Sequence, residues 1–105
     1  MDDLHQAFLL LGSNIDPETH LRRGIELLKG YGKISAVSRA WESRAVGGEG
    51  PNFLNACVLC LTELAPEDVI ERIIRPAELA LGRTRTADRY ASRSMDIDLL
   101  LFDEQ

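Results

Sequence analysis

Short apolar runs and amphipathic segments alternate along the first part of this chain. The run 7–11 is wholly apolar and ends at Gly12-Ser13-Asn14, which predicts a buried strand followed by a turn. A helix should follow over 17–29, because Asp16 suits the N-cap and Pro17 suits the first helical position. Its apolar stripe and terminating glycines are Leu21, Ile25, Leu28, Gly30 and Gly32.

The rest of the chain carries the same two kinds of pattern. Residues 34–43 alternate loosely between polar and β-branched, small or aromatic side chains, which indicates a strand with one wet face. A loop with three glycines and a proline occupies 44–51, and the apolar run 53–61 predicts the next strand. A second helix is expected over 66–82 and a last strand over 94–102. The apolar stripe of that helix is Val69, Ile70, Ile73, Ile74, Ala77 and Leu81.

Pro76 interrupts the second predicted helix. A proline has no backbone N–H, so the hydrogen bond to the carbonyl of Arg72 is lost and we expect a kink or a split. The order of elements is β-α-β-β-α-β, which predicts an α+β, ferredoxin-like fold. In this fold two helices cover one face of a four-stranded antiparallel sheet. A chain of 105 residues with 45% hydrophobic content fills a single core, so we expect one domain over 1–105.

Composition and charge argue against several classes of function. The net charge of −5 disfavours nucleic-acid binding, and the central strands lack the aromatic positions that an RNA-stacking sheet uses. The N-terminus has no basic and apolar leader, and no run is long enough to span a membrane, so we expect a soluble cytoplasmic protein. Cys57 and Cys60 lie in a predicted strand, where residues three apart face opposite ways. We therefore interpret both as buried core thiols, without a disulfide or a metal.

Two aspartates share one face of the last predicted strand. Because side chains alternate along a strand, Asp96 and Asp98 should lie on the face away from the helices, with Cα atoms roughly 6.5–7 Å apart. Carboxylates held this close favour a cation between them, and Mg²⁺ prefers oxygen ligands completed by substrate phosphates. The alternative is an ordinary solvated strand face. The two predicted faces are Met95, Ile97, Leu99 and Leu101 toward the helices, and Ser94, Asp96, Asp98, Leu100 and Phe102 on the open side.

Arginines just upstream change the interpretation of this acidic pair. Four guanidinium groups fall within 83–93, and they suit the oxygens of a compact anion such as a polyphosphate. Carboxylates for a metal and guanidinium groups for phosphate therefore converge on one part of the chain. These arginines are Arg83, Arg85, Arg89 and Arg93.

An aromatic ring and an amide share one face of the third predicted strand. Phe53 and Asn55 are two residues apart, so they point the same way, together with Cys57 and Leu59. A ring that can stack, beside an amide with donors and an acceptor, suits a flat heterocycle with a polar edge. The alternative is a core phenylalanine beside a buried asparagine whose hydrogen bonds are satisfied within the protein.

Four motifs follow one another in order across nearly the whole chain. They are Leu11-Gly12-Ser13-Asn14, Phe53-Leu54-Asn55-Ala56, Leu81-Gly82-Arg83-Thr84-Arg85 and Arg93-Ser94-Met95-Asp96-Ile97-Asp98-Leu99-Leu100-Leu101-Phe102. In order and spacing they resemble the signatures of the 6-hydroxymethyl-7,8-dihydropterin pyrophosphokinase family, and the last motif is the most diagnostic.

The resemblance implies a kinase-type transferase of folate biosynthesis that moves pyrophosphate from ATP to the hydroxymethyl group of a pterin. It implies that Asp96 and Asp98 hold two Mg²⁺ ions, that Asn55 reads the polar edge of the pterin and that Phe53 stacks on its ring. Further pterin contacts are implied for Ser43, Val46 and Gly47. Contacts with ATP are implied for Glu78, Arg83, Arg85 and Arg93, of which Arg83 and Arg93 join the two aspartates as catalytic residues.

Members of this family usually continue for several dozen residues beyond the last motif. We therefore expect this chain to be a short form without the usual C-terminal portion. An alternative function is a catalytically impaired homologue that acts as a pterin-binding, nucleotide-binding or self-assembling module. Leu100 and Phe102 are predicted on an uncovered sheet face, so we also expect a homo-oligomer through that face or through a strand edge.

Overall fold

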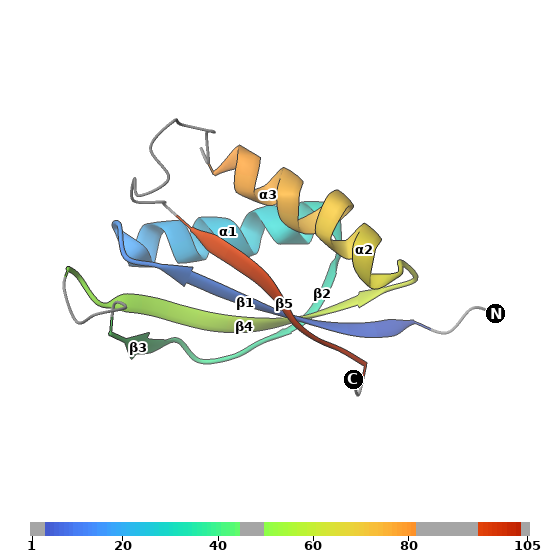
Figure 1. Ribbon diagram of the computed structural model, residues 1–105, viewed down its shortest axis with the longest axis horizontal. Helices are drawn as coiled ribbons and strands as arrows, with labels where there is room; N and C mark the ends of the chain where they lie inside the picture. Colours follow the sequence, from blue (N-terminus) through green and yellow to red (C-terminus); the bar gives the residue numbers. More distant parts are fainter. Residues whose placement is uncertain (1–3, 45–49, 82–94, 104–105) are drawn as a thin grey trace.

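The structure, a computed structural model, describes residues 4–44, 50–81 and 95–103. Strand β1 (His5–Ser13) lies inside the sheet, between two other strands. On one face of β1, Ala7, Leu9 and Leu11 are fully buried. The strand pairs antiparallel with β4 (Phe53–Thr62) and with β5 (Asp96–Phe102), in a sheet of order β2-β4-β1-β5 (Figure 1). The predicted antiparallel α+β arrangement is therefore confirmed.

The edge of the sheet next to β4 is made of two strands where the sequence predicted one over 34–43. They are β2 (Lys33–Val37) and β3 (Trp41–Ser43), and both pair antiparallel with β4. The break falls at Ser38, whose hydroxyl accepts the N–H of Cys57 at 2.8 Å. Because a side chain takes over one hydrogen bond of the ladder, the strand is interrupted without leaving β4. The prediction of one continuous strand was wrong for this reason.

Helix α1 (Pro17–Tyr31) covers one part of the sheet and buries Leu21 and Leu28. Asp16 occupies the N-cap as predicted, but its backbone is left-handed, with φ of 42°, and its side chain makes no capping hydrogen bond. Its carbonyl accepts the N–H of His20 at 3.1 Å instead. The helix ends where the N–H of Gly32 reaches the carbonyl of Leu28 at 2.9 Å, two residues later than predicted.

The second predicted helix consists of α2 (Pro66–Val69), a π-helical turn η2 (Ile70–Ile74) and α3 (Arg75–Ala80). In the π turn, the N–H of Arg75 donates to the carbonyl five residues earlier. This wider turn accommodates Pro76, which cannot donate a hydrogen bond and whose ring would collide with the carbonyl four residues before it. The interruption expected at the proline therefore takes the form of a π turn.

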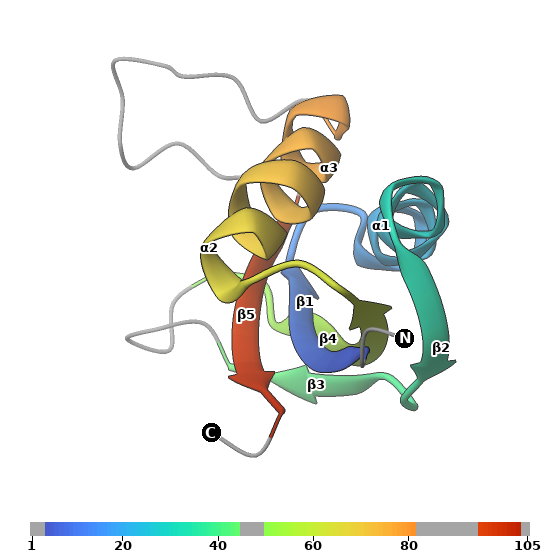
Figure 2. The same ribbon diagram turned by 90° about the vertical axis from the view of Figure 1, so that its right-hand side faces the viewer.

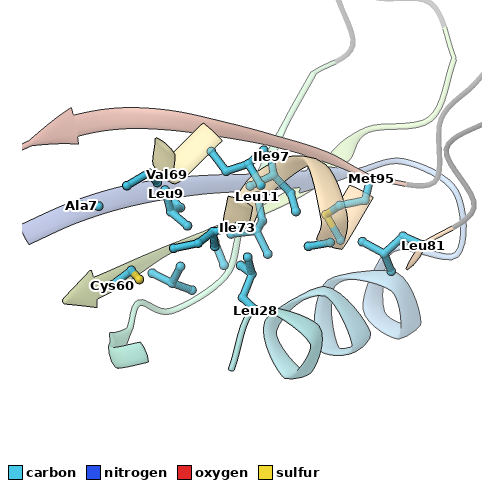
Figure 3. Packing of buried hydrophobic residues seen from close by; sticks show 14 of the residues in the cluster. Ala7, Leu9, Leu11, Leu28, Cys60, Val69, Ile73, Leu81, Met95 and Ile97 are labelled. Atoms are coloured by element: carbon cyan, nitrogen blue, oxygen red, sulfur yellow. The ribbon is translucent and has the colours of Figure 1, made fainter. Parts of the chain in front are cut away.

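The helices lie on one face of the sheet and leave the other face open (Figures 1 and 2). Between helices and sheet is one cluster of buried apolar side chains (Figure 3). The buried members are Ala7, Leu9, Leu11, Leu21, Leu28, Ala56, Val58, Cys60, Val69, Ile73, Ile74, Ala77, Leu81, Met95 and Ile97. None of the helices in the described part of the chain has the length and apolar character needed to cross a membrane.

A β-bulge in β5 overturns part of the predicted face assignment. The strand pairs with β1 at Leu99 and again at Leu101 on successive β1 residues, so Leu100 is an extra residue. Beyond the bulge the alternation of faces reverses. Phe102 packs against the core, and Leu101 is 46% exposed. The prediction that Leu101 faces the helices and Phe102 the open side was therefore wrong.

The end of β5 is fastened to the start of β1 by Asp103. Its carboxylate accepts the N–H of Gln6 at 2.8 Å and lies 2.8 Å from Nδ1 of His5. Its own N–H donates to the carbonyl of Gln6 at 2.7 Å, and the ring of Phe102 lies 4.9 Å from that of His5. The Gln6 N–H, followed by the His5 side chain, lowers the pKa of Asp103. These contacts fix the register of the two strands where β1 begins and β5 ends.

Candidate functional site

The candidate site lies on the open face of the sheet, where three strands place one residue each in a row. Gly12 of β1 is opposite Asn55 of β4 on one side and opposite Asp96 of β5 on the other. Residues directly opposite one another in antiparallel strands point to the same face. The next row on this face, two residues earlier in β1, contains Leu10, Cys57 and Asp98. An amide and two carboxylates therefore share one end of this face.

Asp96 and Asp98 stand on the open face because the residues beside them are anchored below it. Ile97, between them, is only 4% exposed, whereas Asp96 is half-buried and Asp98 is exposed. The strand rise separates their Cα atoms by roughly 6.5–7 Å. The bulge begins only after Leu99, so the alternation of faces is still regular at both aspartates.

These two carboxylates fit Mg²⁺ better than a metal held by protein ligands alone. They supply hard oxygen atoms, and the described residues contain no group of three or more histidine, cysteine, aspartate or glutamate side chains that could hold a metal. Mg²⁺ is commonly bound through one or two carboxylates, with water and substrate phosphates completing its coordination. The donor set therefore suits an ion that arrives with a polyphosphate.

Asn55 is held by the edge strand β3. Its Nδ2 donates to the backbone carbonyl of Trp41 at 3.2 Å and to Oγ of Ser43 at 2.9 Å. Asn55 is only 9% exposed. Both N–H groups of the Asn55 amide are therefore hydrogen-bonded within the protein, as the alternative interpretation of this residue expected.

Gly12 makes room for the Asn55 side chain. A Cβ at this position would lie 2.9 Å from Oδ1 of Asn55 and 3.8 Å from Cδ1 of Phe53. Phe53 is half-buried beside it on the same face and is not part of the core cluster. The ring and the amide therefore lie together over a position that has no side chain.

Glu78 belongs to the support of this site. It lies on α3, is 7% exposed, and its Oε2 accepts the backbone N–H of Ile97 at 3.2 Å. Ile97 stands between the two aspartates on an edge strand of the sheet. The buried carboxylate thus satisfies an edge N–H and fixes the strand segment that carries both acidic side chains.

Several predicted site residues lie outside the described residues, namely Val46, Gly47, Arg83, Arg85 and Arg93. The residues that bound the second gap are both in the core. The side chains of Leu81 and Met95 lie within 4 Å of the position that a Cβ on Gly24 would take, and both are labelled in Figure 3. Met95 directly precedes Asp96 in the sequence, so the segment with the arginines is attached next to the acidic pair.

The two cysteines take different positions, and neither forms a disulfide. Cys60 is fully buried in the core as predicted, whereas Cys57 is half-buried beside Leu10 on the open face, where the prediction of a core thiol was wrong. Desolvation by burial raises the pKa of both thiols. Each is therefore a poor thiolate and a poor metal ligand at neutral pH.

Two contributors to the site were missed by the sequence predictions. Gly12 was assigned to a turn and to the first motif but given no role at the site, although a glycine inside a strand often marks a close approach of another group. The backbone carbonyl of Trp41 gives no sequence signal at all, because its role depends on the register of β3 against β4.

Comparison with known proteins agrees with the order of the motifs. Residues 8–105 match the family described as 7,8-dihydro-6-hydroxymethylpterin-pyrophosphokinase (HPPK). The chain is 38% identical over 100 residues to a 2-amino-4-hydroxy-6-hydroxymethyldihydropteridine pyrophosphokinase of Porphyromonas gingivalis, covering 90% of this chain and 67% of that protein. It is 33% identical over 101 residues to the protein of the same name from Aquifex aeolicus, covering 94% and 62%.

A longer relative is the folate synthesis bifunctional protein of Arabidopsis thaliana. It is 28% identical over 100 residues, which cover 92% of this chain and 20% of that protein. The chain thus spans about two thirds or less of the length of these curated relatives.

Proposed function

We propose a function from the premise that this chain belongs to the 7,8-dihydro-6-hydroxymethylpterin-pyrophosphokinase family. The proposed reaction is the Mg²⁺-dependent transfer of pyrophosphate from ATP to 6-hydroxymethyl-7,8-dihydropterin in folate biosynthesis. The hydroxymethyl oxygen attacks the β-phosphorus of ATP, and AMP leaves.

The row Asn55, Gly12 and Asp96 is the observation that carries this proposal. The Cα atoms of Asn55 and Asp96 are separated by two strand spacings, roughly 10 Å. Gly12 adds no side chain between them. A flat ring beside Asn55 and Phe53 can therefore extend a substituent toward the carboxylates along the face of the sheet.

Residues on either side of this row have complementary roles in the proposal. Phe53 offers a ring for stacking, and Asn55 and Ser43 offer polar atoms to the pterin, with Val46 and Gly47 in the adjoining loop. Asp96 and Asp98 would hold two Mg²⁺ ions, which when bound neutralise charge on the transferred phosphates. Both carboxylates are carried on a strand that Glu78 fixes from the helix side.

Contacts with the phosphates of ATP are proposed for the arginines of the segment that precedes β5. Arg83, Arg85 and Arg93 supply guanidinium groups that stay charged and bind phosphate oxygens in pairs. Arg93 is three positions before Asp96 in the sequence, so chain connectivity supports a common site. Glu78 would contribute to the nucleotide site through β5.

Thermal unfolding with ligands tests this function. A non-hydrolysable ATP analogue with Mg²⁺ should stabilise the chain by about 2.7 kcal/mol at 100-fold its Kd, and 6-hydroxymethylpterin at 100-fold its own Kd should add about as much again. Asp98→Ala should abolish the effect of Mg²⁺ and nucleotide. Glu63→Ala, an exposed acid just beyond the far end of β4, is the matched control and should keep it.

The decisive measurement is AMP release from ATP in the presence of the hydroxymethyl substrate. Release that depends on Mg²⁺, on the pterin and on Asp98 supports the proposal. A melting curve that none of the ligands moves, with no AMP formed, would refute it.

A second candidate is a binding or self-assembling module that has the fold but lacks turnover. The observation in its favour is the apolar surface on the open side, where Leu100 is 53% and Leu101 46% exposed. Burial of such a surface by a second copy would form a homo-oligomer. Pterin binding without AMP release, together with self-association, would favour this candidate over the enzyme.

A further inference from the structure

The end of β5 can pair with β1 in two registers. As far as Leu99, which lies opposite Leu9, the pairing is regular. Continued without a bulge it would bring Leu101 opposite Ala7, whereas the bulge places Phe102 there. Ala7 is fully buried, so the residue opposite it points into the core. One inward position therefore has two candidates that are neighbours in the sequence.

The hydrophobic pattern does not choose between these registers. Residues 100–102 are leucine, leucine and phenylalanine, so either register places an apolar side chain opposite Ala7. A slip of one residue is usually prevented because it exchanges the buried and the solvent-facing side chains of a strand. Here that exchange is between apolar residues, so the choice must depend on contacts outside the pattern.

Asp103 makes such contacts in the bulged register. Its N–H donates to the carbonyl of Gln6 at 2.7 Å, and its carboxylate accepts the N–H of Gln6 at 2.8 Å. The other carboxylate oxygen lies 2.8 Å from Nδ1 of His5. The backbone of Asp103 is left-handed, with φ of 55°, a conformation that aspartate adopts more readily than most residues. A side chain thus supplies the acceptor for the Gln6 N–H.

The bulge-free register has no need of this side chain. Phe102 would then lie opposite Gln6, and its backbone N–H and carbonyl could make both hydrogen bonds of the ladder. Asp103 would move one position further, opposite His5. The contact between the carboxylate and the Gln6 N–H therefore distinguishes the bulged register from the bulge-free one.

We propose that the end of β5 is a two-register element and that the hydrogen bonds of Asp103 hold it in the bulged register. In this register Phe102 packs against the core and Leu101 is exposed. In the other register Leu101 takes the inward position and Phe102 turns to the open face. Asp96 and Asp98 keep their places in both, because they precede the bulge. The element thus changes what one end of the open face presents, and it does not depend on the proposed function.

Nuclear magnetic resonance reports the register directly. Residues of a non-hydrogen-bonded antiparallel pair have Cα atoms about 4.5 Å apart, so their Hα protons give a strong Overhauser effect. The partner of Ala7 in such a pair is Phe102 in the bulged register and Leu101 in the bulge-free one. The wild type should show the Ala7–Phe102 effect, and a wild type with only the Ala7–Leu101 effect would overturn the inference.

Asp103→Ala tests the contacts that hold the register. Loss of the charged acceptor should shift the ratio of the two registers roughly tenfold or more, so that the Ala7–Leu101 effect becomes the stronger one. Asp103→Asn keeps an acceptor oxygen for the Gln6 N–H and is the matched control, which should retain the Ala7–Phe102 effect. A folded Asp103→Ala variant with the wild-type pattern would overturn the inference.

Deletion of Leu100 separates the choice of register from a loss of stability. Without the extra residue, regular pairing after Leu99 places Phe102 opposite Ala7 whatever residue occupies position 103. Adding this deletion to Asp103→Ala should restore the Ala7–Phe102 effect, or restore folding if Asp103→Ala alone is unfolded. A double variant that stays unfolded, or that pairs Ala7 with Leu101, would refute the two-register element.

Discussion

Replacing Gly12 by alanine should disturb Asn55 and little else. The added Cβ would lie 2.9 Å from Oδ1 of Asn55, whereas ordinary contacts begin at 3.4 Å. Gly12 has no left-handed backbone conformation, so alanine suits its backbone. The Asn55 amide must therefore move by about 0.5 Å or rotate, which strains its hydrogen bonds to Trp41 and Ser43.

Two opposing effects set the change in unfolding free energy that Gly12→Ala should cause. Loss of two hydrogen bonds of a nearly buried side chain costs about 1–3 kcal/mol of unfolding free energy. Alanine in place of glycine within a strand returns about 0.5–1 kcal/mol, because the unfolded chain loses less conformational entropy. The net loss is about 1 kcal/mol, or about 4–8 °C in Tm for a domain of this size.

A double-mutant cycle with Asn55→Ala identifies the cause. Urea unfolding of the wild type, both single variants and the double variant should give a coupling energy of about 1–2 kcal/mol, because without Asn55 the new methyl group meets only Phe53 at 3.8 Å. Gly30→Ala is the matched control, since a Cβ there meets nothing within 4 Å in a helix, and it should stabilise by up to about 1 kcal/mol. If Gly12→Ala costs the same with and without Asn55, the steric explanation is wrong.

Three further predictions concern the support of the sheet. Glu78→Ala should lower the unfolding free energy by about 2 kcal/mol, because the Ile97 N–H loses its acceptor, and Glu78→Gln should lower it less. Equal losses for the two variants in urea unfolding would contradict this. Since the pKa of Asp103 is lowered in the folded state, the stability that wild type gains over Asp103→Asn should be present at neutral pH and disappear as pH falls below 3.8, and a difference that persists at pH 2 would refute it. In sedimentation, Leu101→Lys should reduce self-association and Leu79→Lys, exposed on the helix side, should not; a monomeric wild type at tens of micromolar would exclude an oligomer.

Much of the fold was predictable because the core follows simple periods. The apolar run 7–11 predicted a buried strand, in which Ala7, Leu9 and Leu11 are fully buried, and the helical period placed Val69 and Ile73 in the interior. These positions are decided by burial of apolar surface, which a sequence displays directly.

The wrong predictions fall where a single residue departs from the regular hydrogen-bonding pattern of its helix or strand. Ser38 breaks a predicted strand by taking the N–H of Cys57, and Asp16 adopts a left-handed conformation instead of capping with its side chain. Leu100 adds a residue to β5 and reverses the faces beyond it. None of these events changes the local pattern of apolar and polar residues, so periodicity cannot detect them.

The position of the bulge explains why the candidate site was predictable although its surroundings were not. Asp96 and Asp98 lie on the regular side of Leu100, where Ile97 is buried and Leu99 is packed against the core on either side of Asp98. A bulge three residues earlier, with Ile97 as the extra residue, would have turned the acidic pair onto different faces. Regular alternation is therefore confined to the part of β5 that carries the carboxylates, and the irregular part carries only apolar residues. The orientation of both carboxylates depends on the core anchors beside them, and those anchors are visible in the sequence.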